Sequence, residues 1–314
     1  MHFSIVYFKK MYYLCAMNRN LIVMKQTFSI LLIAIVCIGC ESISLEDDKS
    51  NGIGVFSVSE SKKVTFSPSN LYYDRETSSW NFFEEQWNAL TITNLNSPVG
   101  INGRWFSTLA DVAYPESIDT QVQLGKKIDL FGWGTGDNPM LLSEILADYA
   151  NFYDWGFNKI GNDRSKKWRT LHYDEWDYLL HKRSNADSLL HYMSIAGIDG
   201  LMLLPDGWTC PSGVKLKQWP EEAVIPIDIP KYSLEEWRVL EKSGAVFMNA
   251  NCTMRNVAKG WLSLSDLYET RYWVASHSND STGVAISIGP LWKVKFTDEP
   301  RSNGYAVRLV KDIK

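Results

Sequence analysis

Apolar and polar residues alternate with a period of two in several short segments of the chain, and this pattern predicts β-strands. Near the start of the folded part, 55–59 and 64–67 show this alternation and indicate a hairpin. The apolar segments 71–73 and 80–83 flank the turn segment 74–79 and indicate a second hairpin. Two apolar runs, 191–196 and 201–204, flank a glycine-containing turn at 197–200 and predict a third hairpin. Residues rich in β-branched and aromatic side chains predict further strands at 271–276, 283–288, 291–296 and 306–310.

A helical period appears in one long segment, 168–183, which begins with an extended, aromatic entry. Residues in this segment recur at intervals of three and four, so we expect one stripe of the helix to face the core: Tyr173, Trp176, Leu179, Leu180 and Arg183. A second helix is predicted at 234–242, because Ser233 and Glu236 have the spacing of a capping box and Gly244 follows as a stop signal. Residues 140–149 predict a third, short helix.

The composition is that of a globular protein, with 45% hydrophobic and 22% charged residues. Residues 1–39 hold four of the 32 basic residues and none of the 36 acidic ones, so the rest of the chain has a net charge of −8. Binding to nucleic acid needs a basic face, and we therefore expect no nucleic-acid partner.

Residues 1–39 are interpreted as a leader. Met24 and Lys25 precede an apolar run of about ten residues, 29–38, which has the charged and hydrophobic regions of a signal peptide at 24–39. The run is too short to span a bilayer comfortably. Residues 1–23 fit no targeting pattern, and Met24 is the more sensible start of the protein.

The segment 36–40 ends in Gly39 and Cys40 and resembles the lipobox of bacterial lipoproteins, although Cys37 stands where an aliphatic residue is usual. Two or three acyl chains on Cys40 would form a stable membrane anchor, since each buried methylene contributes about 0.8 kcal/mol. Residues 40–51 then form an acidic tether similar to that of surface-exposed lipoproteins of the outer membrane. The alternative is ordinary cleavage of the signal peptide followed by secretion.

Two cysteines, Cys210 and Cys252, remain in the globular part. In an exported protein such a pair favours one disulfide, and the alternative is two free thiols. The distance between their Cα atoms decides between these readings, and the sequence does not give it.

Common catalytic patterns are missing from the sequence, including H-E-x-x-H, G-x-S-x-G and the phosphate-binding P-loop. The glycine-rich segment 132–136 is followed by Pro139 and lacks the helix of a nucleotide-binding motif, so we expect its glycines to pack around Trp133. Glu175 and Asp177 are two residues apart on a predicted helix and point in different directions, which argues against a glycosidase pair. No enzyme activity is predicted.

Thirteen tryptophans are the one excess in the composition that suggests recognition. Indole and phenol rings stack on sugars and anchor protein interfaces. The alternative is that they fill the core of a loop-rich fold. The tryptophans near predicted loops are the binding candidates: Trp133, Trp155, Trp208, Trp261 and Trp292.

Several segments together resemble the sulfatase-modifying-factor, or formylglycine-generating-enzyme-like, superfamily. The residues that carry the resemblance are Arg169, Glu175, Trp176 and Tyr178 in the helix, Trp273 in a Y-W strand and Arg308 in a closing V-R-L-V strand. Residues 56–68 and 129–135 further resemble the "major paralogous domain" surface lipoproteins of Bacteroidetes and Fibrobacter. The resemblance implies a C-type-lectin-like α+β fold, loop-rich, with antiparallel strands and two main helices, as a single domain at 52–314.

The same resemblance implies three alternative functions. The first is a non-catalytic surface lipoprotein that binds an extracellular glycan or protein. The second is a structural component of a cell-surface assembly, and the third is a divergent oxidase with Cys210 and Cys252 as its cysteine pair. Asp137, Asn138, Asn279 and Asp280 offer oxygen ligands, so a Ca²⁺ site of the lectin type is a further possibility, although their spacing is not that of an EF-hand; no other cofactor is expected.

Overall fold

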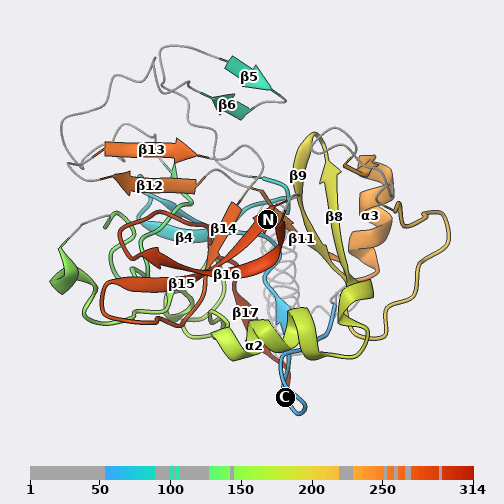
Figure 1. The fold of residues 1–314 in the computed structure, drawn as a ribbon, viewed down its shortest axis with the longest axis horizontal. Helices are drawn as coiled ribbons and strands as arrows, with labels where there is room; N and C mark the ends of the chain where they lie inside the picture. The colour runs from blue at the N-terminus through green and yellow to red at the C-terminus, as the bar shows by residue number, and fades with distance from the viewer. Residues whose placement is uncertain are drawn as a thin grey trace, which may run out of the picture. The chain divides into compact units, whose positions relative to one another are not determined.

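The computed structural model describes these residues: 54–88, 99–101, 104–106, 127–141, 145–218, 229–250, 253–257, 261–265, 270–289 and 292–314. The chain divides into two compact units, Met1–Ser50 and Asn51–Lys314, and every described residue belongs to the second unit. The predicted leader, Cys40 and the whole acidic tether at 40–51 lie outside the described residues. The described part is mixed, with two α-helices and several antiparallel sheets, which agrees with an α+β class (Figure 1).

The first sheet joins the two ends of the described chain. Its antiparallel strands have the order β1-β2-β17: β1 (Phe56–Ser57), β2 (Lys63–Phe66) and β17 (Val310–Asp312). The N-terminal hairpin is therefore confirmed. The last strand begins at Val310 rather than at 306, because Tyr305 and Ala306 form isolated bridges with Phe131 and Tyr272 instead of a continuous ladder.

The second predicted hairpin is also confirmed and gains a third strand. The order is β4-β3-β7: β3 (Leu71–Asp74), β4 (Ser79–Phe82) and β7 (Lys127–Ile128). Two further pairs are separate antiparallel ribbons: β5 (Val99–Ile101) with β6 (Arg104–Phe106), and β12 (Thr253–Val257) with β13 (Trp261–Ser265).

A four-stranded sheet is built around the third hairpin. Its order is β10-β8-β9-β11: β8 (Leu190–Ile195), β9 (Ile198–Leu203), β10 (Lys231–Tyr232) and β11 (Val246–Asn249). The turn is tighter than predicted and consists of Ala196 and Gly197, which both have positive φ, the geometry that joins twisted strands in two residues. Only β10 pairs in parallel among these described strands.

The predicted second helix is α3 (Leu234–Lys242), and its bounds match the prediction. The Ser233 hydroxyl accepts a hydrogen bond from the Glu236 N–H, and the Glu236 carboxylate accepts one from the Ser233 N–H, which completes the capping box. Trp237 and Leu240 are buried and belong to one core cluster with Met202 and Phe247 of the four-stranded sheet. The helix therefore covers one face of this sheet (Figure 1).

The C-terminal sheet has the antiparallel order β14-β15-β16: β14 (Thr270–Trp273), β15 (Thr282–Gly289) and β16 (Trp292–Pro300). The register shifts between Ser287 and Gly289, which marks an irregularity near the β15–β16 turn. Three of the four predicted C-terminal strands thus form one sheet, and the fourth pairs with the N-terminal hairpin.

The long predicted helix is shorter and less regular than its sequence pattern suggests. It consists of α2 (Tyr173–Asp177), which continues directly into the π-helix η4 (Tyr178–Lys182). Trp176, Leu179 and Leu180 are buried as predicted. Tyr173 was predicted to face the core with them, and this was wrong: its side chain is 44% exposed. Tyr173 is the first residue of the helix, so its direction is set by the entering chain rather than by the buried stripe.

Three short 3₁₀ helices complete the described secondary structure: η2 (Leu146–Tyr149), η3 (Trp155–Phe157) and η5 (Ala186–Leu189). The helix predicted at 140–149 is reduced to η2 in the part of it that the structure describes. The Asp154 carboxylate, which is buried, caps η3 and also accepts hydrogen bonds from the N–H and hydroxyl of Thr170. Burial raises the pKa of Asp154, although the hydrogen bonds from Thr170 and Gly156 act in the opposite direction.

The residues that carry the family resemblance occupy structural positions. The Arg169 guanidinium donates to both oxygens of Glu175, at 2.7 and 2.8 Å, and to Asp312 on the last strand. Glu175 also accepts the His172 N–H at 3.0 Å, which fixes the start of α2 as its sequence position suggested. Burial disfavours the charged form of Arg169, but the hydrogen bonds to Glu175 and Asp312 raise its pKa overall.

Trp273 and Arg308 are also buried. The Trp273 indole donates to the Phe131 carbonyl oxygen, and its ring packs 4.5 Å from that of Tyr305. Arg308 donates to the Gln86 side-chain oxygen at 2.8 Å, and burial lowers the pKa of this arginine to about 10. These side chains hold the core together and are not available to a ligand.

Candidate functional site

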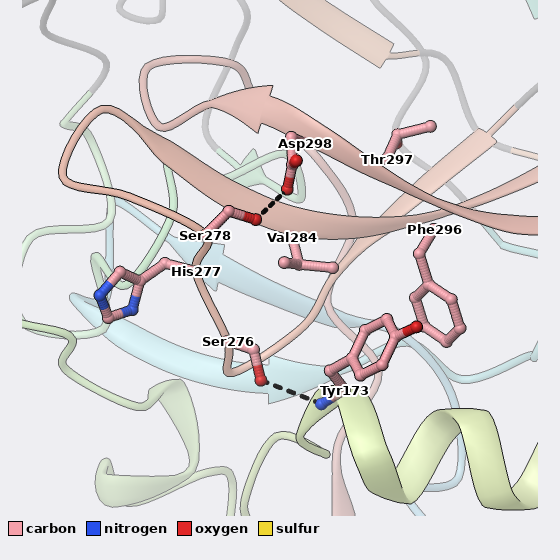
Figure 2. A pocket seen from close by; sticks show the side chains of 8 residues that line it. All are labelled: Tyr173, Ser276, His277, Ser278, Val284, Phe296, Thr297 and Asp298. Atoms are coloured by element: carbon pink, nitrogen blue, oxygen red, sulfur yellow. Dashed lines mark hydrogen bonds between the residues drawn. The ribbon is translucent and has the colours of Figure 1, made fainter.

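A pocket of about 460 Å³ opens between the start of α2 and the C-terminal sheet (Figure 2). Its lining residues come from α2, from the loop between β14 and β15, and from β15 and β16: Tyr173, Ser276, His277, Ser278, Val284, Phe296, Thr297 and Asp298. The volume lies within the range of small-molecule sites, about 300–1,000 Å³. The pocket therefore has the size of a binding site.

One wall of the pocket is aromatic. The rings of Tyr173 and Phe296 have centroids 4.4 Å apart and planes tilted by 50°. Phe296 is partly buried, whereas Tyr173 is substantially exposed, so the pair presents an apolar surface to solvent that is fixed from beneath. An exposed tyrosine held in this way offers a contact surface with little conformational freedom to lose on binding.

The opposite wall is polar and comes mainly from the β14–β15 loop. The Ser276 hydroxyl accepts a hydrogen bond from the Tyr173 N–H at 2.9 Å and thereby ties the loop to the first residue of α2. The Ser278 hydroxyl donates to Oδ1 of Asp298 on β16. Both contacts are drawn in Figure 2, where the His277 imidazole points away from the two aromatic rings. The polar wall is thus fastened at two points.

The pleat of the C-terminal sheet explains why these side chains meet. Val284 lies opposite Asp298 in the ladder, and Ile286 lies opposite Phe296. Residues two apart on a strand share a face, so Phe296 and Asp298 project to the same side of the sheet, and Val284 forms the floor between them. The alternation of side chains along β16 thereby places the apolar Phe296 and the charged Asp298 next to each other on one face of the sheet.

Trp133 supports the polar wall from behind. Its side chain is 2% exposed, its indole donates to the Val274 carbonyl oxygen at 3.0 Å, and the His277 ring packs 5.4 Å from it. A Cβ atom added to Gly283 would lie 2.3 Å from the Trp133 ring, so the glycine is needed for this close contact. The prediction that Trp133 contacts a ligand was wrong, because a buried ring cannot stack on one.

The glycine-rich segment 132–136 was predicted to pack around Trp133. Its residues Gly134 and Gly136 instead pack tightly against residues 152–154. Gly134 has a positive φ and approaches Phe152, and Gly136 lies against the backbone of Tyr153 and Asp154. The segment therefore holds the 152–154 strand-like stretch close, with an isolated bridge between Thr135 and Tyr153.

Asn279 and Asp280 lie in the exposed turn between the pocket loop and β15. The Asn279 side-chain oxygen already accepts three hydrogen bonds, from the N–H and hydroxyl of Ser281 and from the Thr282 N–H. Arg301 holds the turn from below through the Asn279 carbonyl oxygen at 2.8 Å. Burial lowers the pKa of Arg301, and the charge of Asp280 opposes this effect. Hydrogen bonds within the turn thus stabilise it, and the Asn279 side-chain oxygen already has three donors.

Metal ligands are not grouped in the part of the chain that the structure describes: no cluster of three or more His, Cys, Asp or Glu side chains occurs there. The Ca²⁺ site suggested for Asn279 and Asp280 remains a prediction.

The other predicted binding residues lie elsewhere. Trp155 is fully buried, and Trp208 is partly buried, packs against the core under α3 and donates to the Ser243 hydroxyl at 2.8 Å. Trp261 and Trp292 belong to β13 and β16, but their side chains lie outside the described residues. Asn279 and Asp280 directly follow Ser278 of the pocket loop in the sequence.

Cys210 is exposed and forms no disulfide with any described residue; its sulfur donates to the Val214 carbonyl oxygen. Cys252 lies outside the described residues, so the disulfide between them stays a prediction, as does the cysteine pair of an oxidase.

Sequence reasoning missed the residues that make up the pocket. Tyr173 was assigned to the buried stripe, Phe296 to an ordinary strand, and Asp298 to no element at all. The only sequence signal for Tyr173 was its place at the first turn of the helix, where side chains often escape the buried stripe. The serines of the β14–β15 loop carried no signal that distinguishes them from other loop serines.

The pocket brings few polar side chains together. Among the described residues, the Ser276 hydroxyl bonds to the Tyr173 N–H and the Ser278 hydroxyl to Asp298, and no hydrogen bond joins either serine to His277. What the pocket offers is an apolar ring surface, two hydroxyls and one carboxylate.

No helix within the described part of the chain is long and apolar enough to cross a membrane. Comparison of the chain with known protein families, with curated proteins and with solved structures finds no match.

Proposed function

We propose that this chain is a non-catalytic surface lipoprotein that binds a glycan in the pocket between α2 and the C-terminal sheet. The observation that carries the proposal is the pairing of an exposed aromatic wall, Tyr173 on Phe296, with a polar wall of Ser276, Ser278 and Asp298 in one pocket. This combination matches the two kinds of surface that a sugar ring presents.

A pyranose has an apolar C–H face and a polar edge of hydroxyl groups. The apolar face stacks on an aromatic ring, and the hydroxyls pair with carboxylate, hydroxyl and backbone groups. Tyr173 is the ring available for stacking, because Phe296 lies beneath it and keeps it in place. Asp298 and the serines stand where hydroxyls at the edge of a stacked sugar would point.

We further propose that the body has the C-type-lectin-like fold of the formylglycine-generating-enzyme-like superfamily and belongs to the "major paralogous domain" group. Support comes from the sequence motifs and from the α+β class of the described part. The motif residues Arg169, Glu175 and Trp176 anchor the helix that carries Tyr173, so in this proposal the family signature serves to position the pocket.

The location follows from the leader. We propose that Cys40 is lipidated, that the acidic tether at 40–51 places the body at the outside of the outer membrane, and that the partners are the membrane and an extracellular glycan. A Cys40→Ala chain should leave the membrane fraction; if it stays there, the anchor is elsewhere.

The binding proposal is tested on a glycan array with the purified full-length chain and with Tyr173→Ala. The variant keeps the backbone N–H that donates to Ser276, so the pocket loop should stay attached. We expect a defined set of glycans to bind the parent chain, and the variant to lose about threefold to tenfold in affinity, since a stacked ring contributes about 0.5–1.5 kcal/mol.

Phe157→Ala is the matched control, because this phenylalanine is 41% exposed and does not line the pocket. It should bind as the parent does. Binding to no glycan on the array, or equal losses in the two variants, would contradict the proposal.

A second candidate function, a component of a cell-surface assembly, is favoured by one observation. In the described part of the C-terminal sheet, the nine-residue β16 is the outer strand of the order β14-β15-β16. Outer strands are where another chain can add a strand. A partner recovered by cross-linking at cysteines introduced along β16, in a chain that binds no glycan, would favour this alternative.

A further inference from the structure

We infer that Asp298 makes the pocket selective by charge, so that it accepts neutral sugars and amino sugars and rejects sugars that carry a carboxylate. This inference rests on the proposed glycan binding and names the class of sugar that the same pocket takes. It is argued from the position of one carboxylate and from the charges around it.

Asp298 is placed to touch whatever occupies the pocket. It lies on β16, opposite Val284 of the pocket floor and on the same face of the sheet as Phe296. Its Oδ1 accepts the Ser278 hydroxyl, which holds the carboxylate in one orientation. Among the described residues Oδ2 has no hydrogen-bond donor, so this oxygen is left for a ligand.

The negative charge of Asp298 is not neutralised by the described residues around it. Among the eight described lining residues it is the only carboxylate, and none of the eight is a lysine or an arginine. His277, the other ionisable group of the polar wall, points away from the aromatic rings (Figure 2). No ion pair to Asp298 occurs within the described part of the chain.

On the helix side, the charges of Asp177, His181 and Lys182 are already paired with one another. Asp177 accepts Lys182 at 2.6 Å and His181 at 3.0 Å, and the His181 ring lies 6.4 Å from Phe296. The hydrogen bond from Lys182 lowers the pKa of Asp177. On the loop side, the charge of Asp280 acts on Arg301, whose guanidinium lies over the buried Trp133 ring. Of the eight described lining residues, Asp298 is therefore the one that presents a carboxylate to a ligand.

The consequence is a ranking of sugars that differ only in charge. A sugar carboxylate within reach of Asp298 is repelled, and an ammonium group is attracted, each by about fivefold in affinity for a charge near a partly exposed carboxylate. A neutral sugar loses nothing, because its hydroxyls donate to Oδ2. The expected order of affinity is amino sugar, then neutral sugar, then acidic sugar.

The test uses three oligosaccharides of equal length and linkage, built from glucose, glucosamine and glucuronic acid. Their dissociation constants are measured with the full-length chain, with Asp298→Asn and with Asp280→Asn. Asparagine keeps an acceptor oxygen for Ser278, and Asp298 is exposed, so the variant should fold as the parent does. Asp280→Asn is the control: it removes an exposed carboxylate from the β14–β15 loop, and Asp280 does not line the pocket.

We expect the parent chain and Asp280→Asn to rank the sugars as stated, with about fivefold between neighbours. Asp298→Asn should bring the three affinities together, mainly by improving the acidic sugar. Equal affinities in the parent chain, or a ranking that survives in Asp298→Asn, would overturn the inference and leave glycan binding intact. Failure of all three sugars, together with every other glycan tried, would overturn the proposed function itself.

Discussion

The ion pair between Arg169 and Glu175 holds the helix that carries the pocket tyrosine, and replacing Glu175 with glutamine tests how much it contributes. Two charge-assisted hydrogen bonds join the side chains, and the Glu175 carboxylate also accepts the His172 N–H. The Glu175 side chain is only 7% exposed. Glutamine keeps one acceptor oxygen but turns an amide donor toward the guanidinium, so at least one buried donor loses its partner.

The magnitude follows from burial. An exposed ion pair contributes about 0.2–1 kcal/mol, and breaking a fully buried one costs about 3–5 kcal/mol. Here one partner is buried and Arg169 is partly exposed and retains Asp312, so we expect Glu175→Gln to lower the free energy of unfolding by about 2–3 kcal/mol. Asp312→Asn is the matched comparison: it removes the other acid from the same guanidinium, but its side chain is 60% exposed, and the cost should stay below about 1 kcal/mol.

The assay is unfolding of the purified variants in urea, in which a change of midpoint at constant slope reports the change in stability. A cost for Glu175→Gln no larger than that for Asp312→Asn would refute the reasoning, because it would mean that burial of the carboxylate does not strengthen the pair.

Three further predictions concern the core, a helix cap and a histidine. Gly283→Ala places a methyl group against the buried Trp133 ring and should destabilise the chain by about 1–3 kcal/mol, with a change in tryptophan fluorescence; an unchanged stability and spectrum would mean that the ring can move aside. Ser233→Ala removes the side-chain cap of α3 and should cost about 1 kcal/mol in urea unfolding, whereas no cost would show that the cap is dispensable. Burial lowers the pKa of His191 against the effect of its hydrogen bond to Ser188, so the folded chain binds fewer protons there than the unfolded one. The free energy of unfolding should therefore fall as the pH drops from about 7 through the ordinary histidine pKa of about 6.5 and below. The fall should be smaller in His191→Gln, and an identical pH profile in that variant would contradict the prediction.

Local signals were enough to predict the hairpins and α3. The strands around 56–66 show alternation, those around 71–82 flank a polar turn, and Ser233 with Glu236 fixes the start of α3, so short-range chemistry determines these elements. The pairing of strands distant in sequence had no such signal. The contact of β17 with β2, and the place of β7 beside β3, depend on how the whole core closes.

The candidate site was predicted poorly because its residues are selected by tertiary geometry. Trp133 looked like a binding residue because it lies in a loop, but Gly283 lets the β15 backbone pack flat against its ring and bury it. Tyr173 looked like a core residue because of its helical spacing, but it stands at the first turn and faces Phe296 at the surface. Burial in a loop-rich protein depends on which backbone lies above a side chain, and periodicity does not carry that information.

The central claim is that a sugar ring stacks on Tyr173 in the pocket. The most direct measurement is a crystal structure of the chain in complex with a glycan selected on the array. The account predicts a pyranose with its C–H face on the Tyr173 ring and a hydroxyl within hydrogen-bond distance of Asp298. A glycan bound at any other surface, with this pocket holding only water, would contradict it.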